Sequence, residues 1–109
     1  FSIADAFCRK DKRAAWALYV QAINKGVSAE EIHGIILWQV KSMILASESK
    51  GAESAGLKPF VFNKSKTYAE MHGKKALQGM SRRLLIAYHD TRRGLVDIET
   101  MLELEILSL

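Results

Sequence analysis

The sequence is poor in the residues that cross-link a fold or interrupt its helices. Cys8 is the only cysteine among 109 residues, so no internal disulfide can form, and a reducing cytoplasm fits this composition. Pro59 is the only proline. No run of about 18 apolar residues occurs, so we expect no membrane-spanning helix and no membrane partner. Disulfide-stapled and membrane-spanning classes of protein are therefore not expected.

Motifs for nucleotide and metal chemistry are also scarce. No glycine-rich loop followed by Lys and Ser or Thr is present, so the chain by itself is not expected to be a P-loop ATPase. The best candidate metal ligands are His33 or His72, followed by the pair His89-Asp90 and then by Asp97. Their order along the chain is like that of the metal ligands in helical phosphohydrolases of the HD type. Asp97 looks like a helix cap, so we expect no catalytic residue, cofactor or metal, and keep this hydrolase as an alternative.

Along most of the chain, apolar residues recur at helical spacing, and residues typical of helix boundaries separate the segments. No sustained apolar–polar alternation occurs, so strands are not expected. Ser28 followed by Glu31 forms a capping box, and the helix after it is apolar nearly all round, which predicts a central helix. We expect one all-α domain over residues 1–109, an orthogonal bundle of about five helices, with helical segments at about 3–7, 11–25, 29–50, 59–71, 74–93 and beyond 97. Apolar contacts of the 59–71 segment are expected from Phe60, Val61, Phe62, Tyr68 and Met71.

Charge is spread unevenly along the sequence, whose formal net charge is +4. Residues 58–93 carry a net charge of +7, and residues 94–109 carry −4. This pattern indicates either attraction to a polyanion or an acidic partner, or a solvated helix face partly neutralised by its neighbours. A small basic DNA-binding domain is therefore a second alternative, whose candidate weak phosphate contacts are Lys74, Lys75, Arg82, Arg83, Arg92 and Arg93.

The last helical segment has more leucine than a small core needs. An exposed apolar face on a terminal helix usually meets something, either its own domain or a neighbouring subunit. The candidate partner interface is therefore Leu102, Leu104, Ile106, Leu107 and Leu109.

Five short motifs, taken in order, resemble the last domain of the bacterial DNA polymerase III delta subunit. Each motif alone is unspecific, whereas their order and spacing cover almost the whole chain. They are the opening Phe1-Ser2-Ile3-Ala4-Asp5-Ala6-Phe7 with Arg9-Lys10-Asp11, the turn Gly26-Val27-Ser28-Ala29-Glu30-Glu31-Ile32, the segment Ile36-Leu37-Trp38-Gln39-Val40-Lys41, the helix start Leu57-Lys58-Pro59-Phe60-Val61 and the late Tyr88-His89-Asp90-Thr91-Arg92-Arg93-Gly94.

The resemblance implies a role in assembly. Delta is one arm of the clamp loader, which opens the sliding clamp and places it on primed DNA, and its third domain is a helical collar that packs beside the collars of other subunits. The sequence opens on Phe1 rather than Met, so we expect it to be this C-terminal oligomerisation domain, excised from a longer chain. Its partners would be other loader subunits through the collar, with the sliding clamp and primed DNA reached through the parent assembly.

Overall fold

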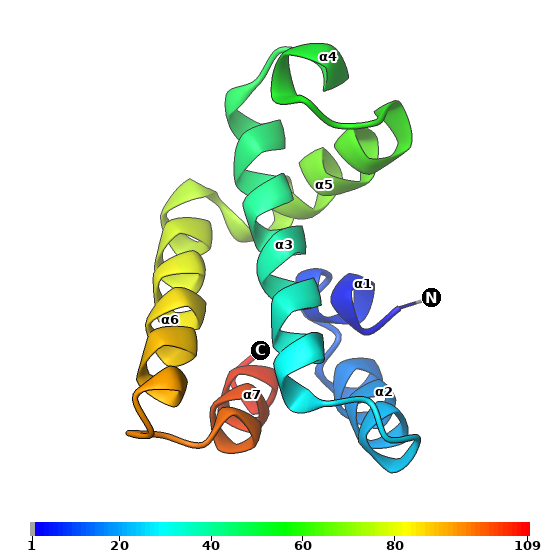
Figure 1. Cartoon of the computed structure of the whole chain (residues 1–109). Coiled ribbons are helices and arrows are strands. Elements are labelled where there is room, and N and C mark those ends of the chain that lie inside the picture. The colour runs from blue at the N-terminus through cyan, green and yellow to red at the C-terminus, as the bar shows by residue number, and fades with distance from the viewer. Residues whose placement is uncertain (1) are drawn as a thin grey trace.

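The computed structural model describes residues 2–109, and Phe1, the first residue of the opening motif, lies outside them. The described residues form seven helices and no strand (Figure 1). The all-α class is confirmed. Helices of the described residues number seven rather than about five: six match the expected segments, including the 6-residue α1, and the 4-residue α4 lies between the expected segments 29–50 and 59–71. The helices are α1 (Ile3–Cys8), α2 (Lys12–Asn24), α3 (Ala29–Glu48), α4 (Ala52–Ala55), α5 (Pro59–His72), α6 (Lys74–Arg92) and α7 (Ile98–Leu107).

Two of the helix starts lie where capping residues predict them. The Ser28 side chain accepts a hydrogen bond from the Glu31 backbone N–H at 3.1 Å and begins α3. The Asp97 side chain accepts one from the Thr100 N–H at 3.3 Å and begins α7. Each bond satisfies a backbone donor that the helix itself leaves without a partner. Local side-chain chemistry therefore sets both boundaries.

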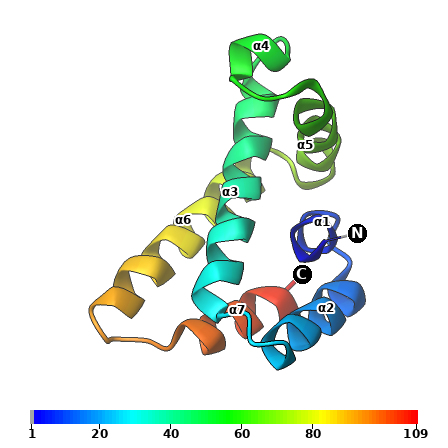
Figure 2. The ribbon, with the colours of Figure 1, turned by 45° about the vertical axis from the view of Figure 1, so that its right-hand side comes forward.

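Helix α3 is the centre of the fold, as its nearly continuous apolar surface predicts. It packs against α1, α4, α5, α6 and α7. Figures 1 and 2 show α4 and α5 at one end of it, α6 along its side, and α1, α2 and α7 near its other end. None of the helices formed by residues 2–109 is long and apolar enough to cross a membrane. The main core is built by fully buried side chains from five helices, namely Phe7, Ala15, Ile32, Ile36, Val40, Met43, Leu77, Leu84, Leu102 and Ile106.

A second, smaller apolar cluster lies at the α4 end of α3. It joins Ala46 of α3, Ala55 of α4 and Phe62 of α5. The expected contacts of α5 are only partly confirmed, because Phe60 and Met71 are 75% and 50% exposed. These two residues are eleven apart, close to three whole turns, so they share a stripe that points away from Phe62 and from the core.

Polar contacts fasten α5 to the amino-terminal helix α1. The Tyr68 hydroxyl donates to an Asp5 carboxylate oxygen at 3.3 Å, and the Lys64 ammonium lies 3.1 Å from the same oxygen. The His72 imidazole bonds to the Cys8 carbonyl oxygen through Nε2. Residues 59 to 64 positions apart in sequence are thus held side by side at three points along α5.

A buried histidine joins the central helix to α6. His33 is 1% exposed, and its Nε2 lies 2.7 Å from the Leu84 carbonyl oxygen. A carbonyl only accepts, so Nε2 carries the proton and donates. The ring also stacks on Tyr88, with ring centroids 6.1 Å apart. The imidazole is thus a structural link between α3 and α6.

We expect the free energy of unfolding to decrease as the pH falls below about 6.5, the ordinary pKa of histidine. Burial lowers the pKa of His33 in the folded protein, although the bond to Leu84 and the carboxylates of Glu105 and Glu30 oppose this. The unfolded chain therefore takes up a proton before the folded chain does. The contribution of His33 to the free energy of unfolding is complete above the pKa that histidine has in the unfolded chain. It is lost as the pH falls from that value toward the lower pKa of His33 in the folded protein. Urea unfolding at several pH values between about 5.5 and 7.5 measures the loss.

Substitutions separate the contributions of the histidines to this pH dependence. Burial also lowers the pKa of His72, which acts in the same direction, so His33→Gln should remove part of the slope rather than all of it. His89 is exposed on α6, and His89→Gln serves as the control. An unchanged slope in His33→Gln would contradict the expectation.

Candidate partner interface

Helix α7 divides the leucine-rich candidate interface into two faces. Leu102 and Ile106 are 1% and 0% exposed and belong to the main core. They were expected to contact a partner, and that prediction is wrong for both, because α2 and α3 pack over this side of α7. Leu109 is partly buried and also packs against the core. Only Leu104 and Leu107 remain as exposed members of the set, at 55% and 50%.

Carboxylates lie beside the two exposed leucines of α7. Glu99, Glu103 and Leu107 follow one another at intervals of four residues and therefore share a ridge of the helix. The Tyr19 hydroxyl of α2 donates to Glu103 at 3.2 Å. Burial, followed by the nearby charges of Glu103, Glu99 and Asp97, raises the pKa of Tyr19 to about 12. We call Leu104, Leu107, Asp97, Glu99 and Glu103 the α7 face, which is apolar and acidic.

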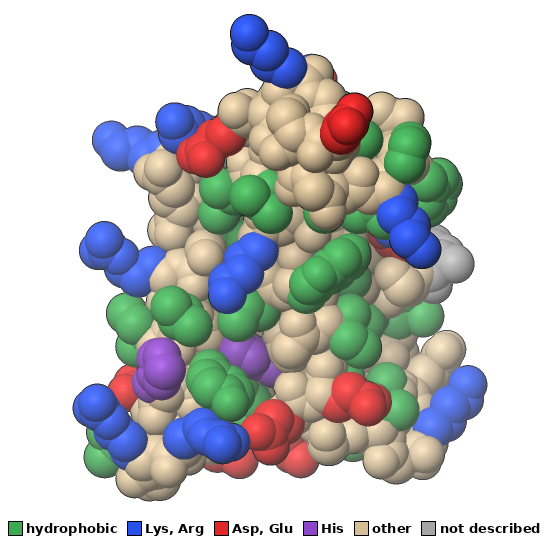
Figure 3. All heavy atoms as spheres, turned by 45° about the horizontal axis from the view of Figure 1, so that its top comes forward, with side chains coloured by type: hydrophobic (Ala, Val, Ile, Leu, Met, Phe, Trp, Pro, Cys, Tyr) green, Lys and Arg blue, Asp and Glu red, His purple; other side chains and the backbone are tan. Residues whose placement is uncertain are grey.

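A second apolar surface, which sequence reasoning missed, runs along the central helix. Ile35, Trp38 and Leu45 are 44%, 54% and 44% exposed, and Lys41 is exposed between them. All four lie on one side of α3 because their spacings are close to whole helical turns. Figure 3 shows hydrophobic side chains gathered across the middle of one molecular face, with basic side chains among them. The only sequence signal for this surface was that the helix is apolar nearly all round.

Two shallow grooves are lined by residues of α3. One, of about 310 Å³, is lined by Trp38 together with Leu57, Lys58 and Val61 from the segment that leads into α5. Another, of about 250 Å³, is lined by Lys41, Ile44 and Leu45. Lys41 and Lys58 make no ion pair with a described residue. Glu31 is on the same side of α3 but lies seven residues, or about two turns, before Trp38. We call Ile35, Trp38, Lys41, Leu45 and Lys58 the α3 face, which is apolar and basic.

The six candidate phosphate contacts all lie on α6 or at its end, but three of them are paired with carboxylates. Lys74 lies 3.9 Å from Glu48, Arg92 lies 3.5 Å from Glu30, and Arg83 lies 2.9 Å from Glu105. The other three, Lys75, Arg82 and Arg93, are exposed and fall on one stripe, because seven and eleven residues are close to two and three turns. The exposed Leu85 and Ile86 interrupt this stripe. The arrangement is a mixed basic and apolar surface rather than a continuous cationic one.

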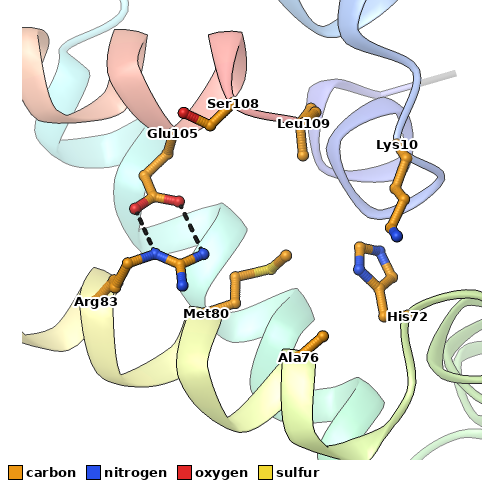
Figure 4. Close-up of a pocket in the computed structure, with 8 residues that line it drawn as sticks. All are labelled: Lys10, His72, Ala76, Met80, Arg83, Glu105, Ser108 and Leu109. Carbon is orange, nitrogen blue, oxygen red and sulfur yellow. Dashed lines mark hydrogen bonds and ion pairs between the residues drawn. The ribbon is translucent and has the colours of Figure 1, made fainter.

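A pocket of about 210 Å³ lies between the α1–α2 turn, the α5–α6 junction and α7 (Figure 4). Arg83 and Glu105 form two parallel contacts on one side of it, with Nε–Oε1 and Nη2–Oε2 distances of 2.9 and 3.4 Å. The Lys10 ammonium and the His72 ring lie together on another side. Burial lowers the pKa of His72, and Lys10 acts in the same direction. The charge of Arg83 is thus offset by Glu105, whereas Lys10, which also lines the pocket, makes no ion pair with another residue of the described range 2–109.

The residues of the hydrolase alternative have structural partners of their own. His33 donates to the Leu84 carbonyl, His72 bonds to the Cys8 carbonyl, and Asp97 caps α7. His89 is exposed and meets the Tyr88 ring edge-on. Within residues 2–109, no three His, Cys, Asp or Glu side chains are grouped so that they can hold a metal ion.

Comparison with known proteins adds no relative from which a role can be carried over. No protein-family model, curated protein or solved structure matched the chain.

Proposed function

We propose that this chain is a non-catalytic structural domain of a bacterial DNA polymerase III clamp loader, the collar domain of its delta subunit, acting in the cytoplasm. The order of the five motifs along the sequence supports the family. The observation that carries the assembly role is the Trp38 surface of the central helix, where a large aromatic side chain is 54% exposed and lines a groove. Tryptophan is among the residues that contribute most to protein interfaces when a partner covers it.

The mechanism of such a domain is subunit adhesion rather than turnover. Apolar side chains on the α3 and α7 faces would supply affinity, because they are removed from water when a neighbour packs on them. Lys41 and Lys58 on one face and the carboxylates on the other would orient the neighbours and disfavour wrong pairings. The collar would thereby hold the subunits together while their ATP-binding modules move, and the sliding clamp and primed DNA would be reached through the rest of the assembly.

Co-purification tests this proposal. When the tagged chain is produced together with the ATPase subunits of the source organism's loader, we expect those subunits to elute with it. Leu104→Glu combined with Leu107→Glu should weaken the association, because both side chains are exposed and the change places charge in the contact. Lys12→Glu combined with Lys50→Glu, at exposed positions outside both faces, is the control. Elution of the wild-type chain alone, with all loader subunits present and soluble, would refute the assembly role.

A further inference from the structure

The α3 face and the α7 face are complementary in chemistry. One presents Ile35, Trp38 and Leu45 with lysines beside them, and the other presents Leu104 and Leu107 with carboxylates beside them. Contact between them would cover apolar side chains on both sides and bring opposite charges together. Neither face is complementary to itself, because a face meeting its own copy would oppose like charges.

The two faces cannot meet within one molecule. Helix α7 is held in the core through Leu102 and Ile106. Leu104 is two residues from each, so it points to the opposite side of the helix, away from the core and from α3. Glu103 lies toward the α2 edge of α7, where its carboxylate accepts a hydrogen bond from the Tyr19 hydroxyl, and it shares a ridge of the helix with Glu99 and the exposed Leu107. Any contact between these faces therefore joins two molecules.

We propose that the α3 face of one copy of this chain docks on the α7 face of a second copy, in a head-to-tail arrangement. The occupant follows from charge, because the carboxylates that match Lys41 and Lys58 are supplied by the chain itself in Asp97, Glu99 and Glu103. The groove of about 310 Å³ beside Trp38 is open to solvent and receives a leucine of the partner's α7. Since the two faces differ, each copy keeps one face free after pairing, and further copies can add.

The contact is weak and salt-dependent. Three exposed apolar side chains on one face and two on the other make a patch smaller than the roughly 1,200–2,000 Å² that stable interfaces bury. We therefore expect association with a dissociation constant of roughly 100 µM. Added salt screens the exposed charges and should weaken the contact further. This inference does not depend on the clamp-loader assignment, because it concerns the purified chain alone.

Sedimentation equilibrium of the whole 109-residue chain over about 10 to 500 µM tests the proposal. The average mass should rise with concentration above the 12.2 kDa of the single chain. Two variants each damage one face at exposed positions, Lys41→Glu with Lys58→Glu on the α3 face and Glu99→Lys with Leu104→Lys on the α7 face. Each should stay monomeric by itself, and Trp38→Ala should do the same without a change of charge.

Mixing the two charge variants gives the deciding result. The first retains a working α7 face and the second a working α3 face, so the mixture should associate and show an average mass above that of either variant alone. Lys25→Glu with Lys50→Glu has the same charge change as the first variant at exposed sites outside both faces, and it should associate like the wild type. A wild type that stays monomeric throughout overturns the proposal, as does a mixture that remains monomeric. Circular dichroism confirms that each variant is folded, and co-purification with loader subunits is a separate readout.

Discussion

Phe7→Ala should lower the free energy of unfolding by about 3–5 kcal/mol, the cost of emptying a buried phenylalanine site. Phe7 is 0% exposed, although it belongs to a helix of only six residues. A helix this short is not stable alone, so it depends on the contact of its apolar side with the core. Natural domains are stable by only about 5–15 kcal/mol. The substitution should therefore remove a large share of the free energy of unfolding and lower the thermal midpoint by well over about 10 °C.

Phe60→Ala removes the same side chain from the surface and is the matched control. Phe60 is 75% exposed, and the Lys64 ammonium lies 5.5 Å from the centroid of its ring. Phe60→Ala should therefore lower the free energy of unfolding by only about 0.5 kcal/mol. Urea unfolding of both variants measures the difference, provided that the slope of the transition stays unchanged. If Phe7→Ala lowered the free energy of unfolding no more than Phe60→Ala does, Phe7 would not be packed in the core as described.

Gly73→Ala should destabilise the protein by about 2–3 kcal/mol through backbone strain alone. Gly73 is the single residue between α5 and α6, with φ 85° and ψ 151°, a region that residues with a Cβ rarely adopt. A Cβ built there meets no atom within 4 Å, so a clash does not contribute. The cost arises because the joint fixes the angle between two long helices, and any relaxation of this residue would rotate one of them.

Gly34→Ala is the matched control for the same chemical change. Gly34 lies inside α3 with helical geometry, is exposed, and has open space around its Cβ position. Alanine there should stabilise the helix by about 0.5–1 kcal/mol. The two variants are thus expected to shift the unfolding midpoint in opposite directions. A shift of the same sign in both would show that the backbone at Gly73 is not constrained as described.

Much of the architecture could be predicted from local sequence signals. The spacing of apolar residues gave the helical class, and Ser28 and Asp97 marked helix starts because capping depends on residues only three positions away. Helix α3 was expected at the centre because an apolar surface all round requires neighbours on several sides. These features were predictable because each depends on interactions within a few residues of the chain.

The candidate interface was predicted less well. The exposure of a side chain depends on which other helix, distant in sequence, packs against its side of the helix. Helical spacing separates Leu102 from Leu104, but only the packing of α2 and α3 on α7 shows that Leu102 is the covered one. The α3 face was missed for the related reason that an all-round apolar helix gives no sign of the side left open. Pairing between distant charges, such as Arg83 with Glu105, was equally invisible, since the partners are 22 residues apart.

Helix α5 crosses from one apolar cluster to the other, and this has a mechanical consequence. Its first turns anchor Phe62 in the small cluster near α4, and Ala69 further along sits in the main core. Tyr68, Lys64 and His72 bind the same rod to α1. A load applied at the small cluster near α4 would therefore be transmitted along α5 to the amino-terminal helix α1.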